Sequence, residues 1–101
     1  MANPPIACTL TPGQINGCRD HLIPGLLTRA LRTEVLPNGY RLMFAPSTDT
    51  LHAIADTLDR ERQCCQFLRF ELTIEPAGAG MVLNVTGPAG TREFLEELFG
   101  R

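Results

Sequence analysis

The sequence predicts an α+β fold in which a four-stranded antiparallel sheet carries helices on one face. Three observations lead to this prediction: two pairs of strand-like runs, an amphipathic helical stretch between the pairs, and helical stretches at both ends. The resulting order, α-ββ-α-ββ-α, is typical of a two-layer sandwich. The chain has 101 residues, so we expect a single domain over residues 1–101, with residues 1–10 as an irregular arm.

The first third of the chain is expected to be helical, with one interruption. Thr11 can cap a helix whose first residue is Pro12. Three residues at helical spacing then share one face: Ile15, Cys18 and Leu22. Pro24-Gly25 should break or kink this helix, and residues 26–31 are expected to form a further helical turn.

Residues 33–36 and 40–45 are expected to form a β-hairpin around Asn38-Gly39. Asn-Gly between strand-like runs is a strong hairpin signal, because glycine adopts positive φ without steric cost. Alternation in the second strand predicts a buried face made of Tyr40, Leu42 and Phe44. The sole tyrosine is therefore expected to be a packing residue.

The central helix is predicted to begin after Ser47, which can cap it, with Asp49 favourable at its positive end. Four apolar residues should form its buried stripe: Leu51, Ile54, Ala55 and Leu58. Cys65 falls on this buried side, whereas Cys64 points about 100° away, toward the rim. Arg62 also falls on the apolar side, so either the helix frays before Cys64 or the Arg62 stem runs along the core edge.

The last part of the chain predicts a second hairpin and a final helix. Residues 70–75 alternate as a half-buried strand, residues 76–80 form a turn, and residues 82–86 return with Leu83 and Val85 inward. Gly87-Pro88 should open the final helix. Its apolar stripe and its end consist of Phe94, Leu95, Leu98, Phe99 and Gly100. The sheet's other face stays open, and we expect it to bind a second copy in a homodimer.

Composition excludes several classes of protein. The net charge of −2 and the lack of a basic stripe argue against nucleic-acid binding. No apolar run is long enough for a membrane span, and the first residues lack a signal-peptide pattern. We therefore expect a cytoplasmic protein with no membrane partner, whose thiols are kept reduced. Motifs for nucleotide, hydrolase and zinc-protease chemistry are missing, so no catalytic residue is assigned and enzymatic activity stays open.

The adjacent cysteines Cys64 and Cys65 carry the most chemical information. A disulfide between them is disfavoured, because neighbouring Cα atoms lie about 3.8 Å apart, below the usual disulfide range of about 4.4–6.8 Å. Two adjacent thiols can instead share one soft ion, such as Hg(II), Cu(I) or trivalent arsenic. The CxxC spacing of structural zinc sites is absent. The predicted cofactor is therefore a soft thiophilic ion held by Cys64 and Cys65.

The other candidate ligands have alternative roles. Cys65 by itself is also a plausible packing residue, and Cys18 is either a core residue or, with His21, part of a secondary ligand set. Cys8 could fold over from the arm as a third sulfur ligand. Glu61, four residues before Cys65, is either a proton acceptor for its thiol or a solvated carboxylate. His52 is too far along the helix from Cys64 to be a ligand.

Residues 61–70 contain the pattern E-x-x-C-C-x-F-x-x-F, formed by Glu61, Cys64, Cys65, Phe67 and Phe70. It resembles small bacterial proteins and regulator tails associated with MerR-type mercury-resistance regulators. The segments 86–88 (Thr-Gly-Pro) and 93–95 (Glu-Phe-Leu) fit the same pattern, and the resemblance spans residues 47–99. It implies that Cys64 and Cys65 face the metal in a heavy-metal resistance protein. The chain has no recognisable DNA-binding helix-turn-helix.

Three hypotheses follow for function. The first is a cytoplasmic binding protein for a soft metal or metalloid, with Cys64 and Cys65 as primary ligands. The second is a thiol oxidoreductase or metal-transfer enzyme, with Cys64 as nucleophile and Cys65 as resolving thiol. The third is an interaction module whose open sheet face binds a partner while the cysteines are only packed.

Overall fold

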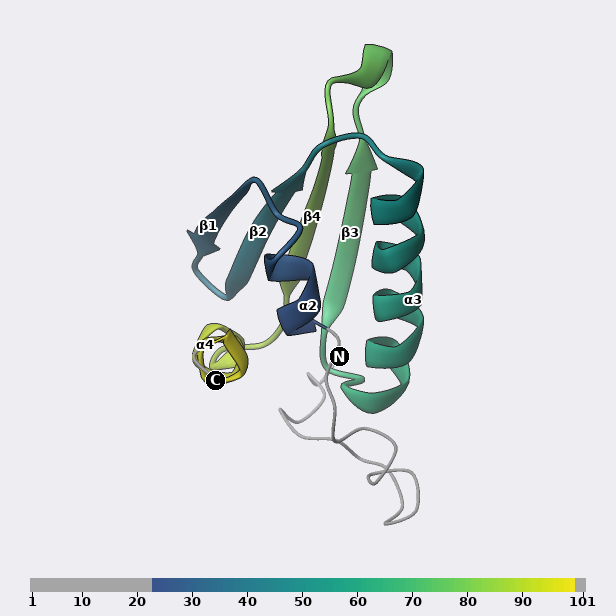
Figure 1. Ribbon diagram of the computed structural model, residues 1–101. Coiled ribbons are helices and arrows are strands. Elements are labelled where there is room, and N and C mark those ends of the chain that lie inside the picture. Colours follow the sequence, from purple (N-terminus) through teal and green to yellow (C-terminus); the bar gives the residue numbers. More distant parts are fainter. Residues whose placement is uncertain (1–22, 100–101) are drawn as a thin grey trace.

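The computed structural model describes residues 23–99, with only the backbone of Phe99, and this part has the predicted α+β fold. Four strands form one antiparallel sheet in the order β1-β2-β4-β3 (Figure 1). The predicted arm and the first predicted helix, and with them Cys8, Cys18 and His21, lie outside the described residues. None of the helices within residues 23–99 has the length and apolar character needed to cross a membrane.

Helix α2 (Ile23–Leu27) contains Pro24-Gly25 in its first turn, and the helix that this pair was predicted to break lies outside the described residues. Proline is tolerated in the first turn of a helix, where its missing N–H would have no helical partner. The helix also ends at Leu27, earlier than expected, because the next residues form a turn: the amides of Arg29 and Ala30 both donate to the Leu26 carbonyl. Its buried residues are Ile23 and Leu26.

The first hairpin pairs β1 (Arg32–Leu36) with β2 (Gly39–Phe44). The turn is Pro37-Asn38, one residue earlier than predicted, because Gly39 already belongs to β2 and pairs with Leu36. Gly39 is needed for close approach rather than for positive φ: a Cβ at this position would collide with the backbone carbonyl of Val85 on β4. The predicted buried face of β2, including Tyr40, is confirmed.

Helix α3 (Thr48–Cys64) begins as predicted, since the Ser47 hydroxyl accepts a hydrogen bond from the Thr50 amide at 3.2 Å. Its buried stripe differs from the prediction. The buried residues are Ile54, Thr57, Glu61 and Cys64. Ala55 is exposed. A threonine can be buried here because its hydroxyl donates to the Ala53 carbonyl at 2.8 Å.

The second hairpin joins β3 (Arg69–Ile74) through the 3₁₀ turn Pro76–Gly78 to β4 (Met81–Thr86), as predicted. Ile74 is 59% exposed, so the end of β3 extends beyond the core. Helix α4 (Thr91–Phe99) begins three residues after Pro88, later than predicted. A turn precedes the helix, because both the amide and the hydroxyl of Thr91 donate to the Pro88 carbonyl.

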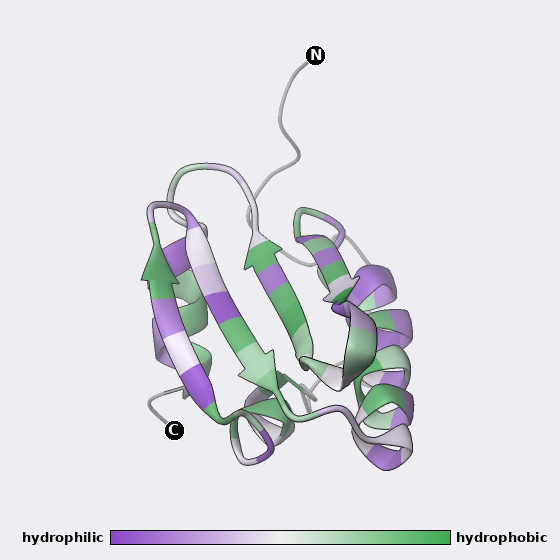
Figure 2. Ribbon diagram, turned by 90° about the horizontal axis from the view of Figure 1, so that it is seen from above, coloured by the Kyte–Doolittle hydropathy of each residue, from purple (hydrophilic) through white to green (hydrophobic). Residues whose placement is uncertain are grey.

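The core lies between the helices and one face of the sheet. Strand side chains of that face pack with residues from all three helices in one cluster, which includes Leu42, Leu83, Ile54 and Leu95. Figure 2 shows apolar positions alternating with polar ones along the strands. Two layers, sheet and helices, are therefore confirmed.

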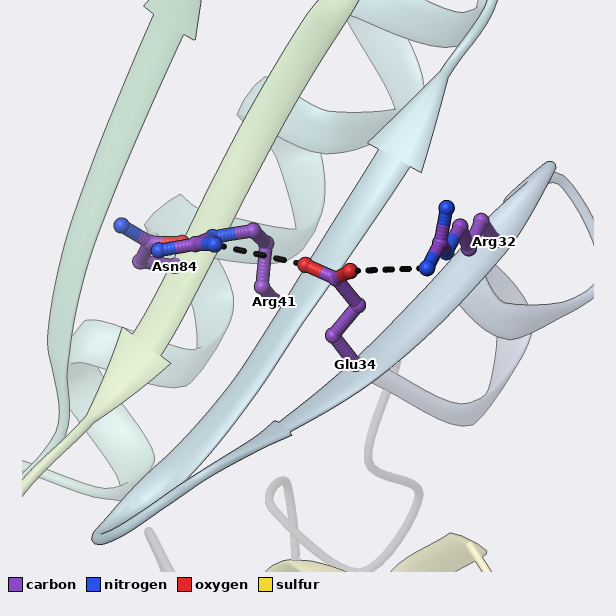
Figure 3. A network of polar contacts seen from close by, with 4 residues as sticks. All are labelled: Arg32, Glu34, Arg41 and Asn84. Carbon is purple, nitrogen blue, oxygen red and sulfur yellow. Dashed lines mark hydrogen bonds and ion pairs between the residues drawn. The ribbon is translucent and has the colours of Figure 1, made fainter.

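The opposite face of the sheet carries a polar network (Figure 3). Glu34 binds Arg32 at 3.1 Å and Arg41 at 3.3 Å, and Arg41 also donates to the Asn84 side chain at 3.1 Å. These four residues, Arg32, Glu34, Arg41 and Asn84, are called the sheet network below. The homodimer through this open face stays a prediction.

Candidate thiol site

Cys64 and Cys65 lie where α3 ends and the chain turns toward β3. Cys64 is the last residue of the helix, and Cys65 is its C-cap, with φ −125° and ψ 77°, outside helical geometry. The Cys65 amide still donates to the Glu61 carbonyl at 2.7 Å, and its own carbonyl accepts from the Leu68 amide at 3.1 Å. The backbone between Cys65 and Leu68 is thus a tight turn that carries the second sulfur.

Both cysteines are buried, with Cys64 4% and Cys65 0% exposed. The prediction for Cys65 is confirmed, whereas the prediction that Cys64 lies at the rim was wrong. An isolated helix would leave the Cys64 flank open. Here the chain turns back at once and places Phe67 and Leu68 in the same core cluster as both sulfurs.

The two cysteines differ in oxidation state. Cys64 is disulfide-bonded, whereas Cys65 is a thiol outside any disulfide. They are therefore not bonded to each other, as the distance argument predicted, and the partner of Cys64 is not among the described cysteines. The disulfide at Cys64 differs from the expectation that the thiols are reduced. A pair of thiols at this site exists only after that disulfide has been reduced.

Glu61 is buried beside the cysteines, with 1% of its surface exposed. Of the two roles considered for it, the solvated carboxylate was wrong, and proton acceptor for Cys65 stays a prediction. Glu61 also makes an interaction within the molecule. Periodicity of apolar residues overlooks such a position, although the spacing from Ile54 through Thr57 to Glu61 and Cys64 is helical and could have revealed it.

The arginines next to the cysteines face solvent. Arg62, which the helical register placed on the apolar side, is exposed and bound to Asp59 at 2.7 Å. Arg69 is also exposed and lies 3.7 Å from Glu71. Neither arginine lies in the core with the sulfurs, so these two charges do little to favour a buried thiolate. A metal ion bound at this site would deprotonate the thiols by itself.

Within the described residues, the sulfurs of Cys64 and Cys65 fit an ion that accepts two sulfur ligands. Within residues 23–99, no three His, Cys, Asp or Glu side chains gather in a way that could hold a metal. A linear two-sulfur ion needs no third ligand, whereas a third sulfur could come only from Cys8 or Cys18, which lie outside the described residues. His52 is exposed, in agreement with its exclusion as a ligand.

An open pocket of about 390 Å³ lies near this turn, between the sheet end and the start of α4. Its lining residues are Asn38, Phe67, Arg69, Thr86, Gly87, Pro88 and Ala89. Neither cysteine lines it. Phe67 separates the pocket from the core, where its ring meets Phe94 edge to face at 5.1 Å.

No protein-family model, no curated protein and no solved structure matches the chain. The resemblance at residues 61–70 to proteins of mercury resistance therefore stays a prediction. The chemistry of the site has to be argued from the geometry of this chain.

Proposed function

We propose that this protein binds a soft metal or metalloid ion through the thiolates of Cys64 and Cys65 in its reduced state. The observation that carries the proposal is that two buried sulfurs lie on consecutive residues at a helix end. In a continuous helix the two side chains would diverge by about 100°. Because Cys65 has left helical geometry, a small backbone adjustment in the turn can bring both sulfurs onto one atom.

Charge favours a divalent ion at this site. Two thiolates and one divalent cation form a neutral unit, whereas a monovalent ion leaves a net negative charge in the core. Burying an uncompensated charge is costly, and the sulfurs are 4% and 0% exposed. Hg(II) is therefore the preferred ion of the proposed class, ahead of Cu(I), and trivalent arsenic would need a third sulfur. Cytoplasmic heavy-metal resistance in a bacterium would be the corresponding physiological role.

The test is metal titration of the reduced protein after the reductant has been removed. One equivalent of Hg(II) should produce a thiolate charge-transfer absorption and raise the melting temperature, because an ion that binds only the folded state stabilises it. The free energy of unfolding should increase by about 4 kcal/mol when the free ion is at a thousandfold excess over its dissociation constant. The protein with its disulfide intact should show neither effect at Cys64.

Matched serine variants locate the site. Cys64→Ser and Cys65→Ser should each abolish the absorption, whereas the double variant Cys8→Ser/Cys18→Ser should retain it with Hg(II). Retention in Cys64→Ser would move the site to Cys8, Cys18 and His21. If no soft ion binds the reduced wild-type protein, the cysteines are packing residues and the proposal fails.

A second candidate is a thiol redox function, favoured by the disulfide at Cys64 next to the thiol of Cys65. A dithiol reductant would transfer two electrons to this disulfide, giving two thiols and the disulfide of the reductant. Equilibration with dithiothreitol buffers would measure its potential. A value near −270 mV or above would support exchange under cellular conditions, whereas a value below about −300 mV would indicate a structural bond.

A further inference from the structure

Strand β1 forms one edge of the sheet, and within residues 23–99 no strand pairs with its outer side. β2 is its neighbour in the sheet. The two-residue turn makes Leu36 and Gly39 a hydrogen-bonded pair, and such pairs alternate along an antiparallel ladder. The backbone N–H and C=O groups of Thr33 and Val35 therefore point away from β2, toward the open edge.

This edge lacks the usual protection. Leu31 is 73% and Val35 61% exposed, and these are two of the three exposed large apolar residues in the described part of the chain. Soluble proteins normally shield an edge strand with proline, a bulge or a covering element, because its free backbone groups bind other strands. β1 has no proline within it. Its exposed apolar side chains instead suggest an edge that is covered by another strand.

The sequence of β1 is complementary to itself in the antiparallel direction. With a two-fold axis through Thr33, Thr33 lies opposite its own copy and Arg32 lies opposite Glu34 of the second copy. The charged pair falls on the face of the sheet network and occurs twice, so the register joins two pairs of opposite charges.

Other registers are poorer. An axis through Glu34 places Glu34 opposite its own copy, and an axis through Arg32 does the same with arginines, so like charges oppose each other. An axis through Val35 places Thr33 opposite Pro37, which has no N–H to donate. The charges and the backbone therefore select the axis through Thr33.

We propose that a second copy of this chain pairs through β1, in this register, to form a two-fold dimer with one continuous sheet. The interface is isologous, as two-fold contacts are. Helices of both copies lie on the same side of the joined sheet. A short strand covers less surface than the about 1,200 Å² of a standard interface, so the dimer dissociates on dilution.

Sedimentation of the full chain over a range of concentrations tests the proposal. Dimer should form at high concentration. Thr33→Pro removes an N–H that faces the open edge without removing a bond to β2, so the dimer should weaken on the order of tenfold or more while the fold persists by circular dichroism. The control Thr48→Pro places proline at the exposed first residue of α3, where it is tolerated, and should leave dimerisation unchanged.

Charge reversal tests the register. Arg32→Glu should place glutamates opposite each other and weaken the dimer on the order of tenfold. Arg32→Glu/Glu34→Arg should restore it, because the opposite charges then face each other again. A protein that stays monomeric at all concentrations would overturn the proposal and leave the edge for a strand of another protein. A dimer that is indifferent to Thr33→Pro would also overturn it and place the interface elsewhere, for example on the sheet network.

Discussion

Two regions of this protein contain the same residue types in opposite surroundings. In the sheet network, Glu34 contacts Arg32 and Arg41, and the exposed fractions of these three side chains are 30%, 69% and 39%. At the end of α3, Glu61 is 1% exposed and lies in the core with Cys64 and Cys65. The sheet network is organised by pairing in water, whereas the thiol site is organised by packing.

The difference determines how much each group matters for stability. Exposed ion pairs are screened and solvated, so each contributes between about 0 and 1 kcal/mol. A buried polar group that loses its interaction costs more, because no water replaces the partner. The thiol site is therefore expected to be sensitive to substitution and the sheet network tolerant.

The largest expected effect concerns the packing of the thiol site. Phe67→Ala should destabilise the protein by about 3–5 kcal/mol, because it removes a buried ring and its edge-to-face contact with Phe94. Urea unfolding followed by circular dichroism measures the change. Phe67→Leu is the control and should recover most of the loss. A cost below about 1 kcal/mol for the alanine variant would show that the turn after α3 contributes little to the core.

A matched pair of glutamate variants compares the two regions directly. Glu61→Gln should cost about 1–3 kcal/mol, since the substitution changes a buried polar group that water cannot reach. Glu34→Gln, which alters the sheet network, should cost less than about 1 kcal/mol, and this cost should shrink in high salt. Equal costs at the two positions would remove the distinction between the regions.

The smallest expected effect is a pH dependence at Tyr40, whose strand also carries Arg41 of the sheet network on its other face. Burial, and then a hydrogen bond with Glu96, raise the pKa of the Tyr40 phenol above its usual value of 10.0. A raised folded-state pKa gives stability that is fully present below about pH 10 and is lost as the pH rises through the higher value.

Unfolding measured at increasing pH should therefore show a decline above pH 10 that Tyr40→Phe lacks. The change can be assigned to the Tyr40 phenol, because the chain contains one tyrosine, no tryptophan and no lysine. Tyrosinate absorbance of the folded protein should appear at higher pH than in the urea-unfolded protein. Coincident titration curves would show that Tyr40 is solvated in the folded state.

The local pattern of the sequence determined the secondary structure. Alternating residues in β2 and β4 defined their buried faces, and Ser47 defined the start of α3, because strand pleating and helix capping depend on neighbouring residues only. The sequence also excluded a bond between Cys64 and Cys65, since that argument needs only the Cα spacing of adjacent residues. The metal ligands themselves stay a prediction from residue chemistry.

Only the tertiary structure decided which groups are buried. Cys64 and Glu61 lie in the core because the chain folds back through Phe67 and Leu68, and Gly39 is required because the backbone of β4 approaches it closely. Helical periodicity gives the angle between side chains but not which segment will cover them. Burial at the end of α3 depends on contacts with residues beyond the helix, which helical periodicity does not contain.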